Sequence, residues 1–247
     1  MRSFVLAPKS RSALSASFRG RRRDVCTLRP RVRNVDAAMK EPIRNIAVAQ
    51  IDQDTLRNLG PLRPMAGLFI SQEARDTHLV DGEESGGQFR DEYVLSPIDP
   101  QIVGGRVLYG LRYLQYARRH GSVAMLDDQV GYWLWDALAS TLTMTQSTPR
   151  GDVLVATGTC EANAAVFTLR ATRESTDIAD VPASTSSQLA TTVSFALTVT
   201  IVDDDSWRYV QETLERVPGQ REANLHRKQA TLVRVSHAPA NASMQLP

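Results

Sequence analysis

Residues 106–118 read Arg-Val-Leu-Tyr-Gly-Leu-Arg-Tyr-Leu-Gln-Tyr-Ala-Arg, and this stretch decides the fold. One parity carries mostly apolar or aromatic side chains, at positions 107, 109, 111, 113, 115 and 117. A period of two with β-forming residues predicts a strand. His120-Gly121-Ser122 predicts a turn, and residues 123–135, which end in Gly-Tyr-Trp-Leu-Trp, are expected to pair back as the next strand.

Short strand-like stretches separated by turns continue toward the C-terminus. They cover residues 141–146, 153–157, 164–172, 191–202, 207–217 and 229–235, with breaks at 137–140 and at Pro149-Arg150-Gly151. Eight or nine strands without a strand-helix-strand rhythm are typical of an all-β barrel or sandwich. Because closure removes exposed strand edges, we expect a single antiparallel up-and-down β-barrel of about ten strands.

The segments before residue 106 predict little regular structure. Residues 52–59 are expected to form a short N-terminal helix that Gly60-Pro61 ends. Residues 71–91 are acidic and loop-like, with three glycines, and the Ser/Thr-rich residues 174–190 predict a long loop. The barrel domain is therefore expected over residues 39–240, followed by a flexible C-terminus at 241–247.

Residues 1–38 differ in composition from the rest of the chain. They hold ten Arg or Lys against two Asp, a net charge of +8, so the remainder carries −6 of the total of +2. We expect a disordered basic tail. Three interpretations stay open: a transit-like segment, an arm that binds nucleic acid through phosphates, and an over-long gene model in which Met39 is the start.

Composition excludes several classes of protein. The sequence has no apolar run of about 18 residues, so no membrane-spanning segment is expected. Aromatic residues make up only 6% of the chain and offer no stacking platform, so nucleic acid is not expected as a partner of the barrel. The two cysteines, Cys26 and Cys160, have neither disulfide-framework nor metal spacing, which favours a reducing compartment and a cytoplasmic location. No Gly-x-Ser-x-Gly hydrolase motif occurs.

The order of landmarks over residues 55–236 resembles the nitrobindin-like haem-binding β-barrel family, whose fold is similar to fatty-acid-binding proteins. The chain is similar to a divergent member of the family's longer bacterial branch. The matching segments are Gly60-Pro61-Leu62, the first-strand segment 65–71, Arg112-Tyr113-Leu114-Gln115, residues 127–135, Pro149-Arg150-Gly151, and His226 with Leu232 and Arg234. The block 128–135 with 149–151 is the most specific part of the resemblance.

The resemblance implies non-covalent haem b bound as a small-molecule ligand inside the barrel. It implies His226 as the axial iron ligand and peroxynitrite-to-nitrate isomerisation as the activity. Phe69, Arg112 and Trp133 are the other expected haem-binding residues, with Arg112 and Arg150 as partners of the propionates. Three positions depart from the family pattern: Phe69 replaces Trp, Ser71 replaces Gly and Asp127 replaces His. These departures fall on residues that shape the chemistry on the distal side of the haem.

Each of these residues also has a purely structural interpretation. His226 is then a solvated strand residue, Phe69 and Trp133 belong to the core, and Arg112 pairs on the surface. The alternative function is a non-enzymatic carrier of a lipophilic molecule in a fatty-acid-binding-like barrel. The other three histidines, His78, His120 and His237, are expected to be solvated in loops or near the C-terminus.

Overall fold

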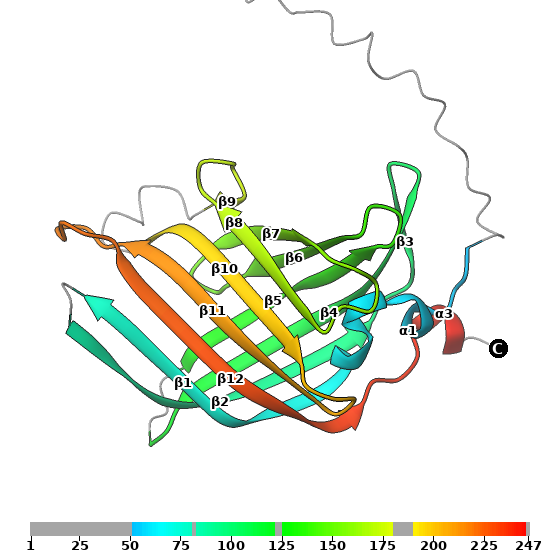
Figure 1. The fold of residues 1–247 in the computed structure, drawn as a ribbon, viewed down its shortest axis with the longest axis horizontal. Coiled ribbons are helices and arrows are strands. Elements are labelled where there is room, and N and C mark those ends of the chain that lie inside the picture. Colours follow the sequence, from blue (N-terminus) through cyan, green and yellow to red (C-terminus); the bar gives the residue numbers. More distant parts are fainter. Residues whose placement is uncertain (1–50, 81–82, 122–124, 180–189, 246–247) are drawn as a thin grey trace, which may run out of the picture. The chain divides into compact units, whose positions relative to one another are not determined.

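The computed structural model contains one antiparallel sheet of twelve strands (Figure 1). The structure describes residues 51–80, 83–121, 125–179 and 190–245. The strands are β1 (Gly67–Val80), β2 (Glu83–Pro97), β3 (Gln101–Val103), β4 (Arg106–Arg119), β5 (Met125–Asp136), β6 (Thr141–Ser147), β7 (Val153–Thr159), β8 (Val166–Thr172), β9 (Ile178–Ala179), β10 (Thr191–Ile201), β11 (Ser206–Arg216) and β12 (Asn224–His237).

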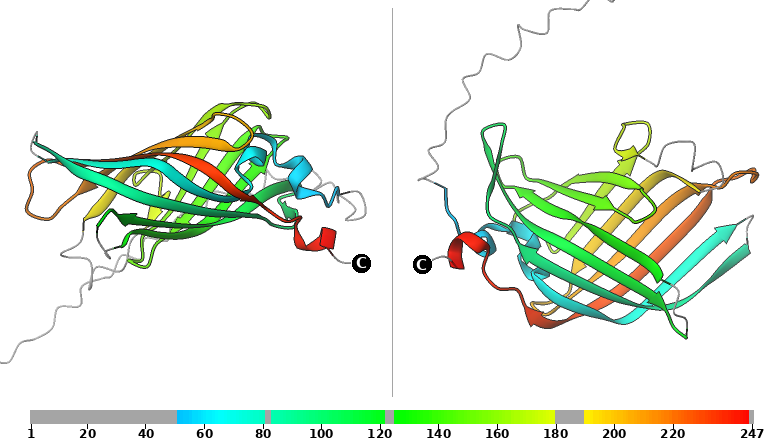
Figure 2. Two further views of the ribbon diagram at one scale, coloured as in Figure 1. Left: turned by 90° about the horizontal axis from the view of Figure 1, so that it is seen from below. Right: turned by 180° about the vertical axis from the view of Figure 1, so that it is seen from behind.

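The sheet closes because β2 pairs with β1 on one side and with β4 on the other. The view from behind in Figure 2 shows β2 and β4 side by side at this closure. Ten strands make the wall, while β3 adds to the edge of β4 and β9 pairs with β7. The prediction of a single antiparallel barrel of about ten strands is therefore confirmed.

The alternation predicted for β4 and β5 is confirmed by the burial of their side chains. In β4 the residues at odd positions from Leu111 to Ala117 are buried and those between them are exposed. In β5, Trp133 and Trp135 are buried on one face, and Tyr132, which lies between Gly131 and Trp133, is 42% exposed. Side chains that alternate in this way line the inside and the outside of the barrel.

The prediction that residues 71–91 form a loop is wrong, because residues 71–80 and 83–91 lie in the paired strands β1 and β2. Two features conceal these strands in the sequence. The β1 residues that face inward in this region include the polar Asp76 and His78, so apolar and polar residues do not alternate. In addition, a register shift between Ile70 and Arg75 in the pairing with β2 interrupts the period of two.

One end of the barrel is plugged by a short helix, α1 (Thr55–Asn58), and a 3₁₀ helix, η2 (Gly60–Met65), close to the helix predicted over 52–59. Leu59, Leu62 and Met65 of this plug are completely buried. Gly60 adopts a positive φ of 55°, and a Cβ atom there would lie 2.5 Å from the indole nitrogen of Trp135. Glycine at this position thus lets the plug lie directly on the core.

Arg234 of β12 holds the plug in place. Its guanidinium donates hydrogen bonds to the backbone oxygens of Pro64 and Ala66, pairs with Asp205 at 3.0 Å, and lies 4.6 Å from the centre of the Phe69 ring. The basic residue of the last-strand motif therefore has a structural role at the plugged end. It fixes the 3₁₀ helix against β1 through hydrogen bonds to two backbone carbonyls.

The segment after β12 returns to the plugged end, where α3 (Ala242–Gln245) lies near α1 in Figure 1. Asn241 is buried, accepts a hydrogen bond from the Thr55 backbone at 3.2 Å, and donates to Asp99 at 2.8 Å. The structure thus shows ordered contacts in a part of the segment 241–247 that was expected to be flexible. The basic tail 1–38 lies outside the described residues. Within the described residues, no helix has the length and apolar character needed to cross a membrane.

Candidate functional site

The interior of the barrel divides into an aromatic half and a polar half. The aromatic half lies against the plug and forms a chain of ring contacts with centroids 5.2–6.4 Å apart. Its rings belong to Phe69, Tyr93, Tyr113, Trp133, Phe167, Trp207 and Tyr209. The opposite half, called the polar end below, is lined by Asp76, His78, Asp127, Gln129, Gln211, Thr213, His226 and Lys228. Charged groups inside a barrel require partners, so we expect a binding or reactive site at the polar end.

A network centred on Asp91 lies between the two halves. Tyr209 Oη donates a hydrogen bond to Asp91, and Gln115 Nε2 donates to the same carboxyl at 3.0 Å. Burial raises the pKa of Asp91 to about 7, although both hydrogen bonds favour its ionised form. Ser71, at the register shift in β1, accepts a hydrogen bond from the Asp91 backbone at 2.8 Å. A serine at this departure from the family pattern therefore satisfies a backbone donor at the bulge.

Lys228 and Asp127 form a buried ion pair across the polar end. The Lys228 ammonium contacts Asp127 Oδ2, and their side chains are only 3% and 8% exposed. Burial opposes ionisation of Asp127, but the charge and the hydrogen bond of Lys228 together outweigh it and lower the pKa of this carboxyl. Gln129 donates a further hydrogen bond to Asp127 at 3.2 Å. Asp127 is thus a fixed anion whose partner comes from β12.

His226 lies two residues before Lys228 on β12 and contacts a second histidine. Antiparallel pairing of β1 with β12 places His78 directly opposite it. The two imidazole rings stack with centroids 3.9 Å apart and planes 14° from parallel. Burial, with smaller contributions from Lys228 and His78, lowers the pKa of His226 to about 4. Its imidazole is therefore neutral at physiological pH, with a nitrogen lone pair available.

Within the described residues, Nε2 of His226 is buried and makes no hydrogen bond. A buried polar atom that lacks a partner is uncommon in proteins. It is the state expected of a nitrogen that is kept available for a ligand. The adjacent cavity has a volume of about 90 Å³, and its lining includes Arg150, Glu215 and Lys228.

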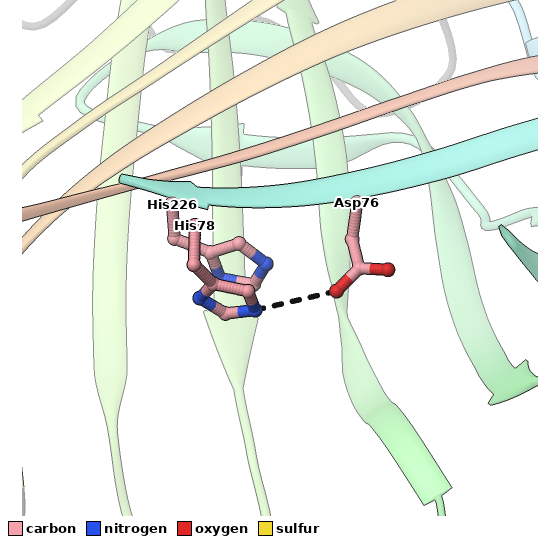
Figure 3. A group of neighbouring side chains, drawn as sticks. All are labelled: Asp76, His78 and His226. Atoms are coloured by element: carbon pink, nitrogen blue, oxygen red, sulfur yellow. Dashed lines mark ion pairs between the residues drawn. The ribbon is translucent and has the colours of Figure 1, made fainter. Parts of the chain in front are cut away.

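Asp76 and His78 complete the group around His226 (Figure 3). His78 Nε2 lies 3.2 Å from Asp76 Oδ2, and one ligand atom from each of the three residues lies within 4.8 Å of the other two. Asp76 is completely buried and receives Arg119 at 2.6 Å. The prediction that His78 is a solvated loop residue is wrong, since it belongs to β1 and packs on His226. Asp76 and His78 are two positions apart in the sequence, which is the spacing of residues on one face of a strand. Because both are polar, this spacing did not indicate a buried face.

The sequence-family model of the THAP4-like, heme-binding beta-barrel domain matches residues 58–234 of this chain. The chain belongs to this haem-binding β-barrel family. The match covers all ten strands of the barrel wall and ends within β12, which carries His226. It confirms the resemblance to nitrobindin-like barrels.

Two solved structures have similar folds at low sequence identity. Rv2717c from M. tuberculosis is 19% identical with a TM-score of 0.47, and the match covers 73% of this chain and 96% of that one. The S-type phycobiliprotein lyase CPES from Guillardia theta is 7% identical with a TM-score of 0.45, covering 70% and 89%. No curated protein sequence matches this chain.

This member of the haem-binding family does not bring all the expected site residues together. Phe69 pairs with Arg234 on β12, and Arg234 lies eight residues from His226, or roughly 26 Å at the rise of a strand. Trp133 lies six residues beyond Asp127 on β5, so it is also in the aromatic half. Arg112 is exposed on the outer face of β4, opposite Tyr132.

The remaining expected site residues and histidines also divide between the polar end and other parts of the barrel. Arg150 lines the cavity beside His226, whereas Arg112, the other expected propionate partner, does not. His120 is an exposed turn residue and His237 is the exposed last residue of β12, as expected. Of the five residues expected to contact haem, His226 and Arg150 therefore lie at the polar end, and Phe69, Arg112 and Trp133 do not.

Proposed function

We propose that this chain binds haem b at the polar end of the barrel, with His226 as the axial ligand of the iron. The observation that carries the proposal is the buried, neutral imidazole of His226, whose Nε2 has no partner among the described residues. Neutral imidazole is the usual protein ligand of haem iron in globins and peroxidases. Membership of a haem-binding family supports the same assignment.

The donor chemistry of the site fits haem iron, and the neighbouring residues have separate tasks. Burial keeps His226 neutral, so no proton competes with a metal for its nitrogen. Arg150, whose side chain is 68% exposed at the cavity, can pair with a carboxylate of a ligand. A macrocycle is larger than a cavity of about 90 Å³, so haem entry requires side chains lining the cavity to move outward.

The family resemblance adds a finer proposal, which is that the loaded protein isomerises peroxynitrite to nitrate and reacts with nitric oxide. The haem would supply the electrophilic iron for this reaction, and the chain would supply the enclosure and one axial nitrogen. The cysteine spacing in the sequence favours a reducing compartment, such as the cytoplasm, for this function.

The alternative of a lipophilic carrier has less structural support. The apolar part of the interior is occupied by side chains such as Trp133, Trp207 and Tyr113, all of which are buried. The cavity beside His226 is lined by charged groups, including Asp127, Glu215 and Lys228. A fatty acyl chain would therefore have to displace core aromatic rings or desolvate ions, and both cost free energy.

A hemin titration of the purified full-length protein tests the proposal. We expect a Soret band with one-to-one stoichiometry and at least about tenfold weaker binding in His226→Ala, which corresponds to about 1.4 kcal/mol. The variant His237→Ala is the matched control, because His237 pairs with Gly67 at the plugged end of the barrel. Wild-type affinity and spectrum in His226→Ala would overturn the assignment. Stopped-flow decay of peroxynitrite, with nitrate as product, tests the finer proposal.

A further inference from the structure

We propose that Asp76, His78 and His226 form a binding site for a divalent first-row transition metal ion, without a porphyrin. The three side chains come from two strands that are distant in sequence and adjacent in the barrel. The site uses the same imidazole as the proposed haem site but adds two ligands that haem binding does not need. It does not depend on haem binding being correct.

The register of the sheet brings the three ligands together. Asp76 and His78 are two positions apart on β1, so their side chains share the inner face of the barrel. His226 lies opposite His78 on β12, and Lys228 lies opposite Asp76. In Figure 3 the two imidazole rings overlap and the Asp76 carboxyl lies beside them. Three ligand atoms thus lie at one point on the wall of the barrel, within 4.8 Å of one another.

Two of these side chains have unused capacity to bind a ligand. Asp76 is completely buried, and its Oδ1 has no hydrogen-bond partner in the described part of the chain. Nε2 of His226 is in the same condition. Buried polar atoms without partners are costly, and a bound cation would satisfy them. The parallel stacking of His78 on His226 joins the ring faces and puts the ring nitrogens at the edges of the stack, where His78 Nε2 lies 3.2 Å from Asp76 Oδ2.

The charges around the site permit a cation. Among the described residues, the cations Arg119 and Lys228 lie beside the ligand Asp76 and the neighbouring Asp127. The Glu215 carboxyl also interacts with His78. Lys228 is neutralised by Asp127 rather than by Asp76. Arg119 contacts Asp76 at 2.6 Å, but its side chain is 37% exposed, so it can swing into solvent when a metal ion takes its place.

The donor set selects the type of metal. Two imidazoles and one carboxylate suit Zn²⁺, Fe²⁺ or Co²⁺, whereas Mg²⁺ and Ca²⁺ prefer oxygen ligands alone. Metal–ligand bonds of about 2.0–2.2 Å require donor atoms roughly 3.3 Å apart. The donors must therefore approach by about 1.5 Å at most. His78, whose side chain is 33% exposed, has the freedom to make this movement.

Titration of the chelator-treated, full-length protein with Co²⁺ tests the site through visible absorption, and calorimetry with Zn²⁺ gives the affinity. We expect one ion per chain, visible bands of nitrogen- and oxygen-coordinated Co²⁺, and displacement of Co²⁺ by Zn²⁺ but not by excess Mg²⁺. His78→Phe should weaken binding at least about tenfold while retaining the stacked ring, and Asp76→Asn should weaken it similarly. His237→Ala is the control with unchanged binding.

The variants separate this proposal from haem binding. His78→Phe should lose Co²⁺ and keep the hemin affinity, whereas His226→Ala should lose both. If the wild type binds Co²⁺ but does not bind hemin, only the haem assignment is overturned. Wild-type Co²⁺ affinity in His78→Phe, in a variant with an unchanged thermal midpoint, would overturn the metal site. Displacement of Co²⁺ by Mg²⁺ would do the same, because the donors would then not be imidazoles.

Discussion

His78 on β1 and His226 on β12 stack face to face across adjacent strands, with ring centroids 3.9 Å apart. This pairing determines what the polar end can do. His226 alone offers a single axial nitrogen, which is sufficient for haem iron. With His78 and Asp76 beside it, the same imidazole becomes part of a three-ligand site. One residue can therefore serve two kinds of metal centre that exclude each other.

The buried face of β5 gives a prediction of stability. Trp133 is 1% exposed and contacts Tyr113 and Phe167 edge to face, at 6.4 Å in each case. Trp133→Ala should lower the free energy of unfolding by about 3–5 kcal/mol, because it leaves a cavity in the aromatic half. Urea unfolding followed by circular dichroism measures this loss. Tyr132→Ala, on the exposed face, is the control, and a loss below about 1 kcal/mol for Trp133→Ala would contradict the packing described here.

The wall of the barrel was predictable from the sequence wherever inward positions are apolar. In β4 and β5 the inward residues Leu111, Tyr113 and Trp133 follow a period of two, although the buried Gln115 and Gln129 interrupt their apolar character, and the sequence predicts both strands. In β1 it fails because the inward residues Asp76 and His78 are polar. Their burial depends on partners from other strands, and a period of two in hydrophobicity cannot indicate such positions.

The candidate site was predictable only in part, for a related reason. His226 was identified by its place in a family motif, and the structure puts it at the polar end. The residues around it depend on strand register, which a single sequence does not reveal. The shift between Ile70 and Arg75 decides which side chains of β1 face inward. Phe69 was expected beside the haem, but it packs against Arg234 at the plugged end. The strand β1 runs from the plugged end, where Phe69 lies, to the polar end, where Asp76 and His78 lie.

Deletion of residues 1–38 should leave the barrel intact. The closed wall, the plug and the aromatic half are all built from residues 55–237, and an Arg- and Ser-rich segment adds no apolar core. We expect the thermal midpoint to change by no more than about 2 °C, which corresponds to well under ~1 kcal/mol. Differential scanning calorimetry of the full-length and shortened chains measures the shift. A drop of about ten degrees would show that the tail belongs to the folded domain.

The ion pair of Lys228 and Asp127 should show strong coupling. Lys228→Met leaves the Asp127 carboxylate buried without its partner, so we expect a loss of about 3–5 kcal/mol in the free energy of unfolding. Combining it with Asp127→Leu removes both charges and should recover most of this loss, since a well-packed apolar pair can replace a buried ion pair. A double-mutant cycle in urea gives the coupling energy. Additive losses from the two changes would show that the charges do not depend on each other.

Asp91 should make the protein less stable as the pH rises. Its pKa is about 7 in the folded state and near 3.8 when unfolded, so the folded state holds an extra proton between these values. Stability from this group is therefore greatest at low pH and is lost as the pH rises toward 7. Burial is the main cause, and the nearby charge of Asp127 acts in the same direction, while Tyr209, Gln115 and Lys228 oppose it.

Asp91→Asn tests this dependence because the amide stays neutral at every pH. The difference in stability between the variant and the wild type should shift in favour of the variant on going from pH 5 to pH 8. The reason is that only the wild type has to bury an ionised carboxylate at the higher pH. Thermal midpoints of both proteins at the two pH values give the difference. Asp128→Asn, a change at a carboxyl group outside this hydrogen-bond network, is the matched control. An equal effect of Asp91→Asn at pH 5 and pH 8 would mean that Asp91 has the same charge at both, and that the hydrogen bonds from Tyr209 and Gln115 outweigh its burial.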